Sequence, residues 1–522
     1  MRSMLAATAG LVLASTLAFT LSIDASAQKP PVFQFTGKPG PHAVGLKVID
    51  QYDYSRTFRS RIDVLGKPFT GERARPIQTL IWYPAEKSSS KPMTVADYID
   101  LLATETPFDH HTREDEIHDK RTGLAPTLAT TLWAVRDAPL ENGHFPLVIY
   151  APSFSASSWE NADLCEFLAS YGYVVVAGTD MGAATRAMTP DLEGVRAQAR
   201  DISFLIGYAQ SLPDADISEI AVAGFSWGGI SNLFAASQDN RIDALVCLDG
   251  SMRYYPGIVK RGEVHPEEMT LPMIFFTQGE FTLEDQEHYL KELDSPNVLN
   301  SWTHGDLTTV HMLGMAHGEF NSENQRDEGF WKDLADFQKA DYGREDGITG
   351  YAWVAQYTLQ FLDAYLKHDA AALAYLKRTP AENGVPKHFL STSYRAAQSL
   401  PPSMERFRKE LGAQGFDHSA EVYAALRKEK PDFTMDEAAL ENWGRELIVE
   451  KHLPEAIDLF KLNLQLHPDV DSAYLWLADT YMEAGQKQSA IETDEALLKK
   501  NPDNAEAKEK LKKWKDANST AK

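Results

Sequence analysis

The sequence predicts an α/β domain with a mainly parallel sheet and helices on both faces, followed by an all-α domain of helical repeats. Three observations lead to this prediction. Short apolar runs alternate with helix-compatible segments through the first two thirds of the chain, as in a parallel sheet with crossover helices. Most of these runs are continuously apolar, which strands buried on both faces require. The last part of the chain instead repeats with a period of 34 residues, which is typical of a stacked helical array.

Seven apolar runs are predicted to be the strands of the sheet. They occupy residues 79–83, 147–150, 173–176, 220–223, 244–248, 273–276 and 308–312. Helices are expected between and after them, at residues 162–171, 192–212, 230–237, 283–293, 324–340 and 351–376. The α/β domain is predicted to extend over residues 28–395.

A charged and partly helical insertion interrupts this alternation at about residues 93–143. Histidines and acids cluster between Asp109 and His118, but their spacing matches no metal motif. We therefore interpret the segment as a solvated insertion, placed where it could cover an active site, and expect no metal ion.

The C-terminal part contains two copies of one pattern. Its repeated positions, each 34 residues apart, are Leu447 and Tyr481, Ala456 and Ala490, Phe460 and Asp494, and Pro468 and Pro502. A small residue midway, an aromatic position and a closing proline resemble the tetratricopeptide repeat. We predict repeats and a capping helix at residues 436–516, preceded by a linker and a degenerate repeat at 396–435. The linker itself is placed at residues 392–403, around Pro401 and Pro402. Arrays of this kind present a concave surface, which could take a protein or peptide partner. The alternative is an appendage that stabilises or dimerises the protein.

The N-terminus has the pattern of a secretory signal peptide over residues 1–27. Arg2 precedes an apolar run at 5–21, and Ala25-Ser26-Ala27 forms a cleavage site before Gln28. The protein is therefore expected in the periplasm or outside the cell. No other stretch of the sequence is long and apolar enough to span a membrane once the signal is removed.

Composition narrows the choice of partners. A net charge of −24 disfavours nucleic acid, because its phosphates would be repelled. The two cysteines, Cys165 and Cys247, fall in a helix-like and a strand-like segment and are interpreted as small buried apolar residues. The sequence leaves open whether the two cysteines form a disulfide.

The segment that indicates chemistry is the turn from Gly224 to Gly229. An apolar β-branched run ends in Gly-Phe-Ser-Trp-Gly-Gly, and a helix-compatible segment follows at once. A strand, a tight turn and a helix form a nucleophile elbow, in which Ser226 would project its hydroxyl from the sheet. Gly224 and Gly228 lack the Cβ atoms that would collide in such a turn. The alternative is a glycine-rich turn without chemistry.

A serine nucleophile needs a base within hydrogen-bond reach and an acid that orients the base. His317 is the preferred base, because it lies in a loop after the last predicted strand. His311, inside that strand, and His304, before it, are the alternatives. Asp249 is the preferred acid, because it directly follows the strand at 244–248, at the sheet edge where sites form in open α/β folds. The later acids Glu280 and Asp285 remain open as alternatives, and Asp249-Gly250 could also be a plain turn.

Two backbone N–H groups must also face the charge that develops on the carbonyl oxygen. Trp227, directly after the nucleophile, is expected to supply one. The loop after the strand at 147–150 is expected to supply the other, because its small residues allow close approach. Phe154 is the preferred donor there, with Ser153 and Ser155 as alternatives.

Between about residues 78 and 376 the chain resembles the α/β-hydrolase superfamily. It is nearest to the platelet-activating-factor acetylhydrolases and the dienelactone-hydrolase-like serine esterases. The resemblance is carried by residues 146–153, 169–175 and 224–229, by Asp249 and by His317. In the acetylhydrolases the acid follows the elbow by a similar interval, which favours Asp249, and their second oxyanion donor corresponds to Phe154.

Two departures from these families narrow what the resemblance implies. The acetylhydrolases carry His-Gly in the oxyanion loop, where this chain has Pro152-Ser153. Dienelactone hydrolases proper use a cysteine nucleophile, and this chain has Ser226. The resemblance thus implies serine hydrolysis more than a phospholipid or lactone substrate.

The expected activity is cleavage of carboxylic esters through an acyl-enzyme, with Ser226, His317 and Asp249 as the triad. Trp227 and Phe154 would form the oxyanion hole. The expected substrate is a small-molecule or lipid-like ester, and no metal or organic cofactor is required. A peptidase or amidase on the same residues is one alternative. An interaction protein, in which the repeats bind a partner and the hydrolase fold is vestigial, is the other.

Overall fold

The computed structural model describes residues 32–516 except 64, 107, 109–112, 280–287, 289–296 and 336–341. The chain forms two compact units. The first extends to Arg395, and the second comprises the residues from Ala396 onward together with Pro266–Thr270 and Trp302–Asp306. The predicted signal peptide lies outside the described residues, and so does the helix predicted at 283–293 apart from His288.

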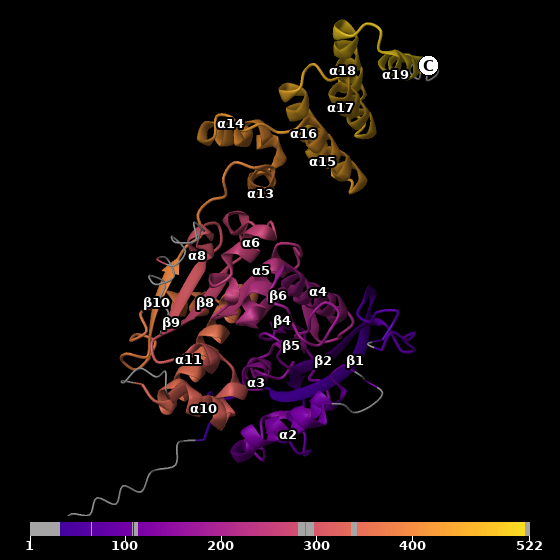
Figure 1. Cartoon of the computed structure of the whole chain (residues 1–522). Coiled ribbons are helices and arrows are strands. Elements are labelled where there is room, and N and C mark those ends of the chain that lie inside the picture. The colour runs from indigo at the N-terminus through magenta and orange to yellow at the C-terminus, as the bar shows by residue number, and fades with distance from the viewer. Residues whose placement is uncertain are drawn as a thin grey trace, which may run out of the picture. The chain divides into compact units, whose positions relative to one another are not determined.

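The first unit is built on one ten-stranded sheet with the order β10-β9-β8-β7-β6-β4-β5-β2-β1-β3 (Figure 1). Its strands are β1 (Ala43–Thr57), β2 (Ala74–Ala85), β3 (Ala134–Arg136), β4 (Phe145–Ala151), β5 (Val174–Gly178), β6 (Ala215–Phe225), β7 (Ala244–Leu248), β8 (Met273–Gln278), β9 (Leu307–Met312) and β10 (Leu390–Arg395). The strands from β5 to β9 pair in parallel, whereas β2 and β10 pair antiparallel with their neighbours. The predicted α/β fold with a mainly parallel sheet is confirmed.

Eleven α-helices of the first unit have bounds within the described residues. They are α1 (Val95–Asp100), α2 (Glu114–Gly123), α3 (Ala162–Ser170), α4 (Leu192–Ala209), α5 (Trp227–Ala236), α6 (Pro256–Arg261), α8 (Val298–Ser301), α9 (Ser322–Arg326), α10 (Glu328–Ala335), α11 (Arg344–Leu366) and α12 (Ala370–Lys377). None of the helices in the described ranges combines the length and apolarity that crossing a bilayer requires.

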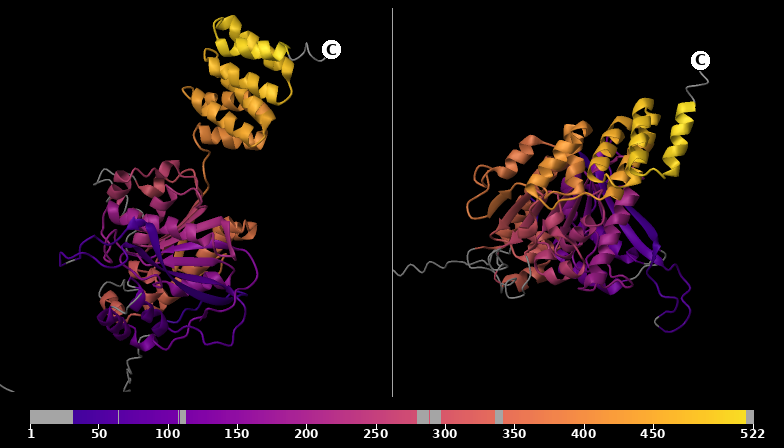
Figure 2. Two further views of the ribbon diagram at one scale, coloured as in Figure 1. Left: turned by 90° about the vertical axis from the view of Figure 1, so that its right-hand side faces the viewer. Right: turned by 90° about the horizontal axis from the view of Figure 1, so that it is seen from above.

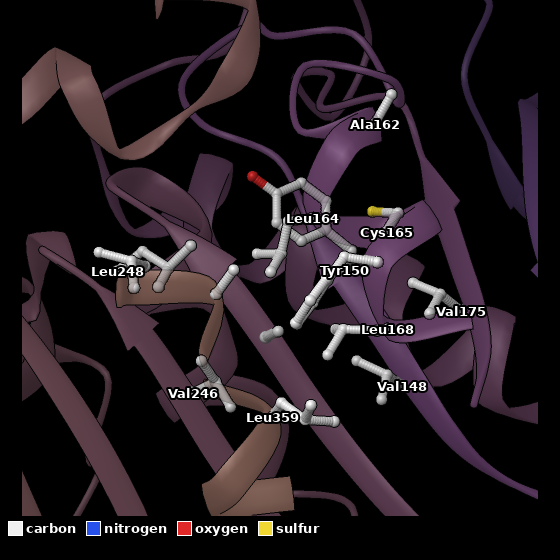
Figure 3. Close-up of a cluster of buried hydrophobic side chains, with 14 of the residues drawn as sticks. Val148, Tyr150, Ala162, Leu164, Cys165, Leu168, Val175, Val246, Leu248 and Leu359 are labelled. Carbon is white, nitrogen blue, oxygen red and sulfur yellow. The ribbon is translucent and has the colours of Figure 1, made fainter. Parts of the chain in front are cut away.

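The sheet is buried on both faces. Val148 and Tyr150 of β4 belong to one buried cluster with Leu168 of α3 and Leu359 of α11 (Figure 3). Successive side chains of a strand point to opposite faces. The intervening residues of β4 are fully buried too, on the face where α4 and α5 pack against the strands. This two-sided burial explains why the central strands read as continuous apolar runs.

Both cysteines are buried and free. Cys165 of α3 belongs to the cluster in Figure 3, and Cys247 lies in β7 with its sulfur 3.8 Å from that of Met273. The disulfide that the sequence left open is therefore not formed.

All seven predicted strands are present, and β1, β3 and β10 were not predicted. The edge strand β10 is polar and pairs only with β9, from Leu390 opposite Met312 to Arg395 opposite Leu307. The predicted linker at 392–403 is therefore wrong over its first four residues, which are strand. An edge strand is held through its backbone and needs no continuous apolar run.

The long helix predicted at 351–376 is two helices, α11 and α12. The chain turns at His368, whose φ of 53° is left-handed. Asp369 then caps α12, because its side chain accepts hydrogen bonds from the N–H groups of Ala371 and Ala372. The prediction joined the two helices because the apolar pattern of the sequence continues on both sides of this N-cap.

The second unit is helical. Its helices are α13 (Met404–Gln414), α14 (Ser419–Glu429), α15 (Glu437–Val449), α16 (Leu453–Leu466), α17 (Asp471–Glu483), α18 (Lys487–Lys500) and α19 (Ala505–Asp516). Figure 2 shows them stacked side by side. Phe460 of α16 packs so closely on Gly444 of α15 that a Cβ there would collide with the ring. The equivalent positions in the next pair are Ala478 and Asp494.

Candidate active site

The turn at Ser226 joins β6 directly to α5. Ser226 has φ 52° and ψ −113°, a strained conformation for a residue with a side chain. Backbone segments pack closely around this turn, so two positions have no room for a side chain. A Cβ on Gly228 would collide with the carbonyl oxygen of Ala151, and one on Gly224 would collide with the backbone of Gly228. The glycines thus let β6 and α5 meet at an angle that exposes the serine hydroxyl above the sheet edge.

Three predicted side chains come together at this edge. His317 Nε2 lies 2.8 Å from Ser226 Oγ, and His317 Nδ1 lies 2.6 Å from Asp249 Oδ2. Ser226 follows β6, Asp249 follows β7, and His317 follows β9, so parallel strands deliver all three at their carboxyl ends. An ionised carboxylate can only accept, so Nδ1 carries the proton and Nε2 accepts from the serine hydroxyl.

Asp249 lies in a fully buried polar environment. Arg253 Nη1 donates to its Oδ1 at 3.0 Å, and the Tyr254 hydroxyl lies 3.2 Å from its Oδ2. Burial alone would raise the pKa of Asp249, but the hydrogen bond from His317 and the charge of Arg253 outweigh it and lower this pKa below its ordinary value. The carboxylate is therefore ionised at neutral pH.

A glutamine fixes the histidine and the tyrosine together. Gln278, the last residue of β8, donates from Nε2 to the Tyr254 hydroxyl at 2.9 Å. Its Oε1 accepts from the backbone N–H of His317 at 3.2 Å. Sequence reasoning did not single out Arg253, Tyr254 or Gln278. Gln278 could have been noticed only as a polar residue that ends a buried strand.

Of the three candidate backbone donors in the loop after β4, two are occupied by acceptors. The N–H of Ser153 donates to Glu160 Oε1 at 2.7 Å, and the N–H of Ser155 donates to Asp180 Oδ2 at 2.8 Å. The N–H of Phe154, between them, has no acceptor among the residues that the structure describes. Of the three candidates in this loop, Phe154 is thus the one with a donor to offer.

Trp227 offers the other predicted donor. It is the first residue of α5, where an N–H group has no intrahelical acceptor. Its position directly after Ser226 places this N–H beside the serine hydroxyl.

Two buried acids shape the loop around Phe154. Glu160 also accepts from the hydroxyls of Ser153 at 2.7 Å and Tyr150 at 2.9 Å. Burial raises the pKa of Glu160 to about 7, although these hydrogen bonds counteract it. Burial likewise raises the pKa of Asp180 well above its ordinary value. These acids were not predicted, because nothing in their sequence positions shows that they reach the loop.

The alternative acids Glu280 and Asp285 lie outside the described residues. The alternative base His304 belongs to the second unit, where its Nδ1 lies 3.2 Å from the carbonyl oxygen of Gln398. His311 lies within β9, opposite Ser391 of β10. Within the described ranges, no three side chains of the metal-binding types gather at one point.

The insertion packs on the helices beside the sheet. The hydroxyl of Tyr98 donates to Glu166 Oε1 of α3 at 2.6 Å, and Lys120 pairs with Glu323 of α9. Residues 109–112, which hold three of the seven acids and histidines of the predicted cluster, lie outside the described residues. The other four lie in α2.

Comparison with known proteins agrees with this division of the chain. A family model described as "Tetratricopeptide repeat" matches residues 447–513. Among solved structures, a ferulic acid esterase from Streptomyces cinnamoneus is similar with a TM-score of 0.50 and 19% sequence identity. The similarity covers 70% of this chain and 99% of the esterase. The search of curated proteins finds no match. The first unit thus has a fold of the α/β-hydrolase type, and residues 447–513 are similar to tetratricopeptide repeats.

Proposed function

We propose that this protein is a serine hydrolase that cleaves carboxylic esters through an acyl-enzyme. The observation that carries the proposal is the continuous hydrogen-bonded chain from Ser226 Oγ through His317 to Asp249. The elbow conformation of Ser226 and the two backbone donors beside it support the same chemistry.

In the proposed reaction, His317 Nε2 takes the proton of Ser226 as Oγ attacks the ester carbonyl carbon. The N–H groups of Trp227 and Phe154 hold the oxyanion. Asp249 keeps His317 oriented and stabilises the imidazolium. The imidazolium then protonates the departing alcohol, and the acyl group remains on Ser226. A water molecule, deprotonated by His317, releases the acid and restores the serine.

Esters are favoured over amides as substrates because one of the similar solved structures is an esterase. A peptidase or amidase on the same residues is the second candidate. The test is turnover of short and longer p-nitrophenyl esters, alongside p-nitroanilides, by the wild type and by Ser226→Ala. Ser237→Ala, at the other end of α5, is the matched control. Equal rates for the wild type and Ser226→Ala, or faster turnover of anilides than of esters, would contradict the proposal.

For the second unit we propose a protein or peptide partner, as tetratricopeptide repeats commonly bind one. A groove of about 570 Å³ in this unit supports the proposal. Its lining includes the apolar residues Leu411, Phe416 and Pro454 and the acids Asp417 and Glu455. An apolar segment with basic residues would complement it. The intact triad geometry argues against a vestigial hydrolase fold.

We also propose export to the periplasm or the medium, with cleavage before Gln28. The support is the n-region, apolar run and cleavage site of the sequence. The full-length chain expressed in a bacterial host should be recovered outside the cytoplasm with Gln28 as its first residue. Recovery of the chain in the cytoplasm with its original N-terminus would contradict export.

A further inference from the structure

Two large aromatic side chains stay exposed beside the proposed nucleophile. Phe154 is 43% exposed and Tyr255 is 39% exposed. Both contact Trp227, which is 1% exposed. The ring centroids of Phe154 and Trp227 are 5.4 Å apart at an interplanar angle of 86°, and those of Trp227 and Tyr255 are 5.6 Å apart at 83°. We refer to these three residues as the aromatic wall.

Each member of the aromatic wall is tied to Ser226. Trp227 follows it in the chain, and Phe154 carries the backbone donor proposed for the oxyanion. The Ser251 N–H donates to the Ser226 carbonyl at 2.7 Å, and the Tyr255 N–H donates to the Ser251 carbonyl at 3.1 Å. The wall therefore lies where a group attached to the reacting ester would meet the protein.

The wall is uncharged and held in place before any substrate binds. The buried indole of Trp227 supports both exposed rings in edge-to-face contacts, the arrangement that aromatic pairs prefer. A rigid planar group docking on such a surface loses little rotamer freedom, whereas an alkyl chain loses more. A second aromatic ring also gains quadrupole interactions that a saturated group of equal size cannot make.

We propose that the aromatic wall binds a neutral aromatic ring of the ester substrate. This inference rests on the proposed function and names the substrate class of the same site. Phe154 and Tyr255 act as specificity-determining residues through their side chains.

The experiment compares kcat/KM for esters that differ only in the ring. One pair is ethyl 3-phenylpropanoate and ethyl 3-cyclohexylpropanoate, and the other is benzyl acetate and cyclohexylmethyl acetate. The wild type should prefer the phenyl ester of at least one pair by roughly two- to tenfold. Tyr255→Leu and Phe154→Leu should bring this ratio close to one. Tyr54→Leu, which removes an aromatic residue that is 76% exposed on β1, should leave the ratio unchanged.

Each outcome decides between the two proposals. A wild type that hydrolyses p-nitrophenyl acetate but shows no phenyl preference in either pair overturns the ring inference alone. Equal ratios in Tyr255→Leu and Tyr54→Leu, with unchanged melting temperatures, overturn the assignment to the wall. A wild type that hydrolyses no ester overturns the proposed function and this inference with it.

Discussion

Replacing Glu160 by leucine tests whether a buried acid positions the proposed oxyanion donor. Glu160 makes three hydrogen bonds, to the N–H and hydroxyl of Ser153 and to the hydroxyl of Tyr150. Hydrogen bonds to a charged group contribute about 1.5–3 kcal/mol each, so their loss frees the loop at Ser153 and with it the N–H of Phe154. Loss of one oxyanion donor costs about 10²–10³ in kcat. We expect Glu160→Leu to lower kcat by about 10²-fold.

Two variants separate positioning from general damage. Glu160→Gln keeps an acceptor for Ser153 and Tyr150, and the Ser153 hydroxyl can rotate to accept from the new amide, so kcat should stay within about tenfold of the wild type. Glu166→Leu removes another buried acid of the same region, which binds the Tyr98 hydroxyl and the N–H of Trp133 instead of the oxyanion loop. It should lower stability with little effect on kcat.

The raised pKa of Glu160 also makes the stability of the protein depend on pH. Its folded value of about 7 lies above the ordinary 4.5, so its contribution to stability is fully present below about pH 4.5 and is lost as pH rises through 7. The loss amounts to roughly 3 kcal/mol. The free energy of unfolding of the wild type should therefore fall more steeply over this range than that of Glu160→Gln.

The assay is steady-state hydrolysis of p-nitrophenyl acetate, with thermal unfolding of each variant as the control. The positioning role is refuted if folded Glu160→Leu keeps kcat within threefold of the wild type. It is also refuted if Glu166→Leu loses as much kcat as Glu160→Leu.

Three further predictions follow from the site and the repeats. Asp249→Asn should lower kcat by about 10²–10⁴-fold, because an amide cannot hold His317 in the required tautomer. Steady-state kinetics of the variant tests this prediction, and a loss of less than fivefold in kcat would show that another residue is the acid. Deleting residues 400–522 should leave p-nitrophenyl acetate turnover within about twofold, because the triad lies wholly in the first unit; a larger loss in a folded protein would give the repeats a part in catalysis. Asp494→Leu should stabilise the second unit at pH 8 by roughly 1–3 kcal/mol, because both carboxylate oxygens of this buried residue lack partners among the described residues. Burial raises the pKa of Asp494 to about 7, so the wild type loses stability as pH rises through 7. In chemical unfolding, the free energy of unfolding should fall with pH in the wild type but not in the variant.

The central strands and the repeats were predictable because two-sided burial and a repeat period both appear directly as patterns in the sequence. Strands buried on both faces must be apolar throughout, so β4 to β9 could be found from their runs. The 34-residue period likewise revealed α15 to α18. The inner strand β1 and the edge strand β10 carry polar residues, and their identity as strands depends on partners far away in the chain.

The candidate site divides in the same way. Ser226, Asp249 and His317 could be proposed because each follows a predicted strand in the required chain order. The supporting groups could not, since Arg253, Gln278, Glu160 and Asp180 act only through neighbours that the fold brings to them.

The sequence by itself determined the α/β class, the helical-repeat tail and the order of a serine, an acid and a histidine at strand ends. These features depend on local pattern, and local pattern is present in the chain before it folds. Only the tertiary structure decided that Ser226 and His317 lie 2.8 Å apart, that the N–H of Phe154 rather than that of Ser153 is left available, and that Phe154 and Tyr255 meet across Trp227. Each of these depends on contacts between particular atoms, and the distances between those atoms are set by how the folded chain packs, which no local pattern shows.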